Sequence, residues 1–520
     1  MMLDSTQTDE PYIRITRHDG RYTVEGLPHC YLSPIRSGGS RGAQETIYAE
    51  WSWDGTTLTV RNDRLGFYPL FYAHSGHELL VSPSLSALLA RGASTELDEA
   101  ALATFLRLGF FLGDDTPFKA IRALPPNGCL RWTVGAPQIQ GSLWSPKRQS
   151  VTPTAAMDLY AHVLRAAVRQ SIPAERPWAL LLSGGQDSRH ILLTLWELGC
   201  LPDACLTARY YSGADEDVVA ASVAQAFGAK HLILDQHQSE LAVEARKNVL
   251  THYGAFEHDW AVVLMDHVAG RYSALYDGIG GDVLSAGLYQ DEYRLRLFQE
   301  GRLRELADVL MGSEGYCPGL LTTGAYRRLG REVARERIAA ELGRHHDAAN
   351  PLGSFFFWNR TRRCVALNPF ALLGRSCSVL TPYLDPRVYE LLASLPATMF
   401  LDHQFHLKTI ARAFPQAAEI PYQPKQLRPT GNGAAYRRLA LDLLRHSRNG
   451  SGLLARRSFI SVRALRALVD PGYAPAVRTF GRTATYLLQL EAITSQNGVH
   501  LGDARKYWGV GFSLLTSVPV

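Results

Sequence analysis

Hydrophobic and polar positions divide the chain into three regions with different patterns. Up to about residue 145, β-branched and aromatic runs alternate with Gly and Asp turns, which is typical of short strands. The clearest of these runs are 22–24, 47–53, 58–61 and 79–81. A helix is expected over 97–108, where apolar residues recur at three- and four-residue spacing and two acids open the first turn.

The second region, about 154 to 295, alternates apolar runs with helical patterns. Strands are expected at 178–182, 204–207 and 231–234, and helices at 155–170, 188–198 and 215–227. This alternation is the signature of a doubly wound parallel sheet. The third region, about 296 to 520, is rich in Leu, Arg and Ala with helical periodicity. The pattern therefore predicts an α/β protein, with a β-rich N-terminal region and a helical C-terminal region.

Composition narrows the class of protein. Over 520 residues, 46% are hydrophobic and 20% are charged, which excludes disordered and fibrous classes. A net charge of +5 is too small to indicate a nucleic-acid partner. No segment approaches the roughly 18 apolar residues of a membrane span, and residues 1–10 are too polar for a signal peptide. Seven irregularly spaced cysteines fit a reducing compartment. We therefore expect a cytoplasmic protein with neither nucleic acid nor membrane as partner.

The most informative segment follows the predicted strand 178–182. Gly184 and Gly185 let the backbone turn with its amides exposed, and a helix begins at once, so the loop predicts an anion site. Ser183 and Ser188 can add hydroxyl donors. A carboxylate, Asp187, fits a phosphate site only with a cation between the charges, which indicates Mg²⁺. The alternative is a plain strand-to-helix turn, and the complete strand–loop–helix context favours the anion site.

This loop resembles the pyrophosphate-binding loop of the ATP pyrophosphatases. Other segments narrow the resemblance to the asparagine synthetase family, to which β-lactam synthetases and lasso-peptide cyclases are related. The resembling segments are 62–72, 124–128, 143–145, 215–231, 276–282 and 381–385, together with Lys408 and 424–425. The resemblance covers roughly residues 45–430. It implies a degenerate class II glutamine amidotransferase-like β-sandwich (1–145), a linker (146–153), an ATP pyrophosphatase-type synthetase domain (154–430) and a helical extension (431–520).

The resemblance also implies an activity. Family members activate a carboxylate as an acyl-adenylate with ATP and Mg²⁺, release pyrophosphate, and let ammonia or an amine displace AMP. The carboxylate would belong to a small molecule or a peptide, and a homodimer is one arrangement to test. By the same resemblance, ATP and pyrophosphate contact Leu182, Ser183, Gly184, Gly185, Asp187, Ser188, Asp277 and Gly278. The metal ligands would be Asp187 and Asp282, and the catalytic lysines Lys425 and Lys408.

Three departures from the family change the expected chemistry. Glutamine hydrolysis needs an N-terminal cysteine, whereas this chain begins Met1-Met2-Leu3 and its first cysteine is Cys30; we therefore expect no glutaminase activity. Ile279 stands where asparagine synthetases have Glu and β-lactam synthetases have Tyr, and Val283 replaces a further Glu. An aliphatic side chain cannot move a proton, so another group must handle the amine, or the nucleophile differs. Glu257, His258 and Asp259 are candidates unless they are only surface residues.

Several alternatives stay open. The ligase could join two molecules, close a ring within one substrate, or have become an inactive nucleotide-binding scaffold. The run 355–358 is expected to be a buried helical turn rather than a substrate pocket. Arg360, Arg362 and Arg363 are expected on a solvated helix face, with phosphate or acidic-peptide binding as the alternative, and Arg189 is close enough in sequence to reach pyrophosphate.

Overall fold

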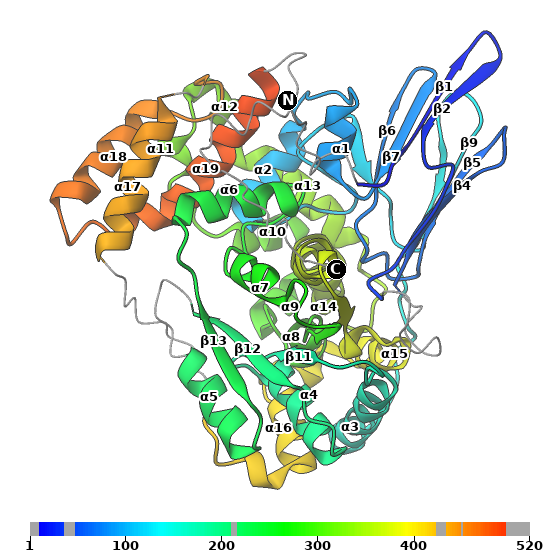
Figure 1. Cartoon of the computed structure of the whole chain (residues 1–520), viewed down its shortest axis with the longest axis vertical. Helices are drawn as coiled ribbons and strands as arrows, with labels where there is room; N and C mark the ends of the chain where they lie inside the picture. Colours follow the sequence, from blue (N-terminus) through cyan, green and yellow to red (C-terminus); the bar gives the residue numbers. More distant parts are fainter. Residues whose placement is uncertain (1–9, 36–46, 210–215, 423–432, 449–450, 496–520) are drawn as a thin grey trace, which may run out of the picture.

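The computed structural model describes residues 10–35, 47–209, 216–422, 433–448 and 451–495. Figure 1 shows two antiparallel sheets at one end of the molecule, a parallel sheet at the other, and helices between them. The helices α17 and α18 lie at a third corner, away from both groups of strands. None of the helices in the described ranges is long and apolar enough to cross a membrane.

The N-terminal region contains the short strands that the alternating runs predict, and they form the β-sandwich that the resemblance implies. One sheet has the order β2 (Arg21–Gly26), β1 (Ile13–His18), β7 (Glu78–Ser82), β6 (Phe71–Ser75), β8 (Ile121–Ala123). The other has the order β10 (Gln138–Gln140), β9 (Cys129–Trp132), β5 (Leu58–Asn62), β4 (Ala49–Trp53), β3 (His29–Leu32). Alternate side chains such as Ile13 and Ile15 pack against Trp51 and Val60 of the opposite sheet, which excludes water between the sheets.

Two helices lie between β7 and β8 in the chain, α1 (Leu85–Ala90) and α2 (Glu99–Leu108). The predicted helix over 97–108 therefore begins two residues later, because Asp98 is its N-cap and accepts a hydrogen bond from the amide of Ala101. Residues 141–152 contain no helix or strand and lead to α3 (Pro153–Gln170).

The predicted doubly wound sheet takes four strands from the second region and a fifth, Ser378–Leu380, from the third. All five strands are parallel, in the order β13 (His231–Asp235), β12 (Ala204–Arg209), β11 (Trp178–Leu181), β14 (Ala274–Tyr276), β15 (Ser378–Leu380). Trp178 and Leu180 face α3, α4 (Gln186–Glu197) and α5 (Glu216–Ala226), whereas Ala179 and Leu275 face α7 (Ala261–Val268). Both faces are thus buried, which explains the nearly continuous apolar run of β11. The short strands β14 and β15 are not apparent from the sequence pattern.

The order of the strands in the parallel sheet indicates where a ligand would bind. β12 and β13 lie on one side of β11, and β14 and β15 lie on the other. The chain direction of the windings therefore reverses between β11 and β14, and in open α/β sheets ligands bind at the carboxyl ends of the strands at such a switch point.

The remaining elements are helical, and most of them lie in the third region, where the sequence pattern predicts helices. They are α6 (Glu240–Leu250), α8 (Gly281–Ser285), α9 (Glu292–Gln299), α10 (Leu303–Met311), α11 (Cys317–Leu320), α12 (Thr323–Arg328), α13 (Arg331–Gly343), α14 (Pro351–Phe356), the π-helices η1 (Phe357–Val365) and η2 (Asn368–Leu372), the 3₁₀ turns η3 (Leu373–Arg375), η4 (Pro382–Leu384), η5 (Ala397–Met399) and η6 (Pro415–Ala417), α15 (Pro386–Ser394), α16 (Phe405–Ala413), α17 (Gly433–Ser447), α18 (Arg457–Val469) and α19 (Ala476–Ser495). Residues 355–358 are buried in α14 and η1, which confirms the expected buried helical turn.

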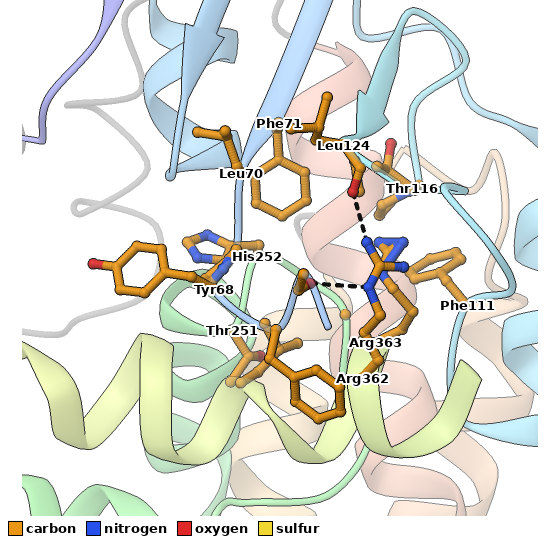
Figure 2. A pocket seen from close by; sticks show the side chains of 17 residues that line it. Tyr68, Leu70, Phe71, Phe111, Thr116, Leu124, Thr251, His252, Arg362 and Arg363 are labelled. Atoms are coloured by element: carbon orange, nitrogen blue, oxygen red, sulfur yellow. Dashed lines mark hydrogen bonds between the residues drawn. The ribbon is translucent and has the colours of Figure 1, made fainter. Parts of the chain in front are cut away.

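Two arginines of η1 join the β-sandwich to the helices, so their expected place on a solvated helix face is wrong. Arg362 donates from Nε to the carbonyl of Gly66 at 2.9 Å and from Nη2 to that of Leu124 at 2.6 Å. Arg363 donates to the carbonyls of Gly113 and Asp115, each at 2.8 Å. Figure 2 shows the Arg362 bonds beside a cavity of about 30 Å³ between the two regions. These buried carbonyls need donors, and the arginines supply them.

Candidate functional site

A cavity of about 300 Å³ lies at the carboxyl ends of β11 and β14, where the switch point predicts a ligand site. Its wall combines apolar strand and helix residues with carboxylates, hydroxyls, an imidazole and an amide. The lining residues used below are Leu182, Ser183, Asp187, Ser188, Glu216, His258, Asp277, Gly278, Ile279, Asp282 and Asn368. Six of the eight predicted ATP and pyrophosphate contacts line this one cavity, and so do both predicted metal ligands.

The loop after β11 is held open by its own serines. The amide of Ser183 donates to Ser188 Oγ at 3.0 Å, and the amide of Gly185 donates to Ser183 Oγ at 3.1 Å. Gly185 is the N-cap of α4 and has no side chain to satisfy the first amides of that twelve-residue helix. The two remaining predicted contacts, Gly184 and Gly185, contribute backbone amides, and that of Gly184 bonds to the carboxylate of Glu216. The loop therefore has the strand–turn–helix geometry on which the predicted anion site depends, although the amides of Gly184 and Gly185 have acceptors within the protein in this structure.

The two predicted metal ligands come together across a glycine. The amide of Asp282 hydrogen-bonds to the carboxylate of Asp187. A Cβ on Gly281 would lie 2.5 Å from Asp187 Cγ, so only glycine leaves room for this carboxylate. The Asp282 side chain is 41% exposed and that of Asp187 is 22% exposed, and both border the cavity.

The three acids of the cavity have few positively charged or hydrogen-bonding neighbours to stabilise their ionised forms. Burial raises the pKa of Asp187 to about 7 and that of Asp277 to about 6. Burial and then the neighbouring Asp187 raise the pKa of Asp282 to about 6, although Arg360 opposes the shift from 3.9 Å. A cation between Asp187 and Asp282 would remove this penalty, and carboxylate oxygens are the ligands that Mg²⁺ prefers. The residues present therefore fit the metal.

Asp277 is fixed as a hydrogen-bond acceptor on the adjacent wall. Its Oδ1 accepts the amide of Ile279 at 2.8 Å, and its Oδ2 accepts Asn368 Nδ2 at 3.1 Å. Gly278 packs against Asp187, where an added Cβ would lie 3.0 Å from Asp187 Cβ. Asn368 was not anticipated, because nothing in its local sequence marks a residue that η2 brings to the cavity.

The structure describes only one of the two lysines that were predicted to be catalytic. Lys425 lies outside the described residues. Lys408 lies on α16 with its side chain 56% exposed, and its Nζ donates to Asp402 Oδ2 at 2.8 Å. It is not among the residues that line the cavity, so its catalytic role stays a prediction that this geometry does not support.

Two other arginines have partners that the sequence did not reveal. Arg189 is fully buried and donates to the carbonyls of Ile420 and Pro421 at 2.8 and 2.7 Å, with its guanidinium 3.7 Å from the ring centroid of Tyr422. It is therefore directed away from the predicted pyrophosphate. Arg360 pairs with Glu257 at 3.0 Å and is largely buried rather than on a solvated face.

Of the three residues that could handle the amine, His258 lines the cavity and the other two form ion pairs with arginines. His258 lines the cavity and is 3% exposed, so the idea of a surface residue is wrong for it. Asp259 is equally buried but pairs with Arg482, and Glu257 pairs with Arg360. His258 Nε2 lies 3.2 Å from the carbonyl of Cys364. Because a carbonyl can only accept, Nε2 carries the proton, and burial keeps the ring neutral by lowering its pKa to about 4.

The fold and the cavity define the class of protein: an N-terminal β-sandwich beside a doubly wound sheet, with a glycine-rich anion loop and paired acids at the switch point. Comparison with protein families gives the same result. The asparagine synthase family matches residues 159–495, and a glutamine amidotransferase domain matches residues 44–142. The chain belongs to the asparagine synthase family. This membership supports an ATP-dependent ligase that forms carbon–nitrogen bonds. A search of curated proteins finds no match.

Proposed function

We propose that this chain activates a carboxylate as an acyl-adenylate and then forms an amide, releasing pyrophosphate and AMP. The observation that carries the proposal is the meeting of Asp187 and Asp282, from two different strand ends, beside the open amides of one helix. Cleavage between the α- and β-phosphates concentrates charge on pyrophosphate, and this arrangement is suited to hold such a charge. The acid would belong to a small molecule or a peptide.

The residues of the chain take distinct roles in this reaction. Asp187 and Asp282 would hold Mg²⁺, whose charge neutralises the leaving phosphates. The amides at Gly184, Gly185 and Ser188 would bind and orient the same phosphates, and those of Gly184 and Gly185 would exchange their present acceptors, Glu216 and Ser183 Oγ, for phosphate oxygens. A carboxylate oxygen of the substrate attacks the α-phosphorus, and the bond to the β-phosphate oxygen breaks. The amine nitrogen then attacks the acyl carbon, AMP leaves with the electrons of the carbon–oxygen bond, and the nitrogen loses a proton.

We propose that His258 accepts the hydrogen bond of the attacking amine, since Ile279 cannot. The Nδ1 atom of His258 is the ring nitrogen without a proton. The backbone φ of His258 is +82°, which residues other than glycine seldom adopt. His258→Phe should slow amide formation by 10²-fold or more and leave pyrophosphate exchange within about threefold. Equal losses in both assays would contradict this role.

We further propose that the nitrogen comes from ammonia or a substrate amine and not from glutamine. Cys30 lies inside β3, and burial raises the pKa of its thiol to about 11, which opposes formation of the nucleophilic thiolate. Glutamate release from glutamine at a rate matching amide formation would refute this part of the proposal.

ATP–pyrophosphate exchange tests the central step. The purified chain is incubated with labelled pyrophosphate and a panel of amino acids, hydroxy acids and short peptides. We expect exchange that depends on one class of acid and on Mg²⁺. Asp187→Ala should abolish it, whereas Asp158→Asn should not, because Asp158 is an exposed acid paired with Arg412. Nucleotide binding without exchange across the panel would favour the inactive scaffold. Mass spectrometry of the product distinguishes ring closure, with loss of water from one substrate, from joining of two molecules.

A further inference from the structure

Behind Asp187 lies a buried polar network that the reaction scheme above does not use. His406 on α16 places Nδ1 3.3 Å from Asp187 Oδ1 and 2.9 Å from Ser285 Oγ. Its Nε2 lies 3.1 Å from His190 Nδ1 and 3.3 Å from the hydroxyl of Tyr160. His406, His190, Ser285 and Tyr160 are each 1% exposed or less. Side chains from α3, α4 and α8 therefore contact the imidazole ring of His406 on α16.

The hydrogen bonds of the network determine which nitrogen of His406 carries the proton. Ser285 Oγ lies 2.7 Å from the carbonyl of Gly281, and a carbonyl only accepts, so the hydroxyl donates there. Ser285 then has no proton left for His406 and must accept from it. Nδ1 is therefore the protonated nitrogen, and Nε2 accepts from His190 or Tyr160. Burial lowers the pKa of His406 to about 3, in agreement with a neutral ring.

This tautomer directs the N–H to Ser285 Oγ at 2.9 Å, and Asp187 Oδ1 lies 3.3 Å from the same nitrogen, where the polarised N–H attracts the carboxylate. The Asp187 carboxylate already receives the amide of Asp282, and Tyr383 donates from its hydroxyl to the Asp187 backbone carbonyl at 2.9 Å. These donors hold both the side chain and the backbone of the residue. Carboxylates that bind metals are commonly oriented by such outer hydrogen bonds, whose loss costs 10–100-fold in metal affinity.

We propose that His406 is a positioning residue, whose Nδ1–H orients the Asp187 carboxylate so that it presents its free lone pairs to a divalent cation in the cavity. The inference rests on the proposed function, in which Asp187 binds the metal. It adds a requirement that the proposed function does not contain: the position of a single N–H on a side chain outside the cavity.

Two isosteres separate this role from simple packing. The amide nitrogen of Asn occupies the place of Nδ1, whereas that of Gln occupies the place of Nε2. Both substitutions remove the same buried ring, so a packing role predicts similar losses of stability and of metal binding. The positioning role predicts that only His406→Asn retains the metal.

The measurement is Mn²⁺ binding to the complex of protein and α,β-methylene-ATP, followed by the enhancement of water-proton relaxation over a matched sample of Mn²⁺ and nucleotide without protein, because the nucleotide alone also binds Mn²⁺. For His406→Gln we expect affinity reduced 10–100-fold, and for His406→Asn a change within about threefold. Equal losses in the two variants, or no loss in either, would overturn the positioning role while leaving the proposed function intact. Absence of Mn²⁺ binding in the unaltered chain would refute the proposed function and this inference together.

A second measurement uses the unaltered chain and does not depend on the folding of a variant. Nitrogen-15 NMR of imidazole-labelled protein distinguishes a protonated ring nitrogen from a bare one. We expect His406 to be neutral with the proton on Nδ1 from pH 6 to 8. A proton on Nε2 would overturn the inference.

Discussion

Replacing Arg362 with Met tests how the β-sandwich is joined to the helices. The substitution keeps an unbranched apolar stem and removes the guanidinium, so the carbonyls of Gly66 and Leu124 lose their donors. Each buried acceptor left unpaired costs about 1–3 kcal/mol. Part of this cost is offset because a buried charge is also removed. We therefore expect the free energy of unfolding to fall by about 3 kcal/mol.

Urea denaturation followed by tryptophan fluorescence measures this change. The matched control is Arg304→Met, because Arg304 is 72% exposed and its ion pair with Glu336 is solvated; we expect a loss below about 1 kcal/mol there. Limited proteolysis of Arg362→Met should also cleave between the β-sandwich and α3 sooner than in the unaltered chain. A loss for Arg362→Met no larger than that of the control would refute the reasoning.

Three further predictions concern the predicted metal and nucleotide site and the lysine Lys408. Gly281→Ala should weaken Mn²⁺–nucleotide binding at least tenfold with little change in melting temperature, because the new Cβ displaces the Asp187 carboxylate; unchanged binding would contradict the close approach. The pKa values of Asp187 and Asp282 are raised to about 7 and 6, so protons compete with the metal for these carboxylates below those pH values, Mg²⁺ affinity should rise from pH 5.5 to 8, and binding should release protons. Calorimetry in buffers of different ionisation enthalpy measures this release, and proton uptake on binding would contradict the prediction. Lys408→Met should change pyrophosphate exchange less than threefold, because this lysine is exposed and paired with Asp402; a larger loss would support its predicted catalytic role.

The elements that the sequence predicts well are those whose signal is local. β11 is an apolar run because both of its faces are buried, and the serines and glycines after it turn the chain through bonds within a few residues. β14 is only three residues long and gives no comparable pattern. The helix over 97–108 was placed two residues early because Asp98, which could belong to a first turn, serves instead as the cap.

The predictions that failed depend on contacts between distant parts of the chain. Arg362 and Arg363 have the spacing of a solvated helix face, but the π-helix η1 lies against the β-sandwich and turns them to its carbonyls. His406 has no motif around it, and only the packing of α16 beside α4 brings it to Asp187. The roles of such residues are set by tertiary structure, which the local pattern does not contain.

The central claim is that Asp187 and Asp282 share one divalent cation over the phosphates of a nucleotide. Anomalous diffraction from crystals grown with Mn²⁺ and α,β-methylene-ATP tests it most directly. We predict a single strong manganese peak within coordination distance of both carboxylates, with the phosphates against the amides of Gly184 and Gly185. A nucleotide bound elsewhere, or a manganese peak that contacts neither carboxylate, would contradict the account.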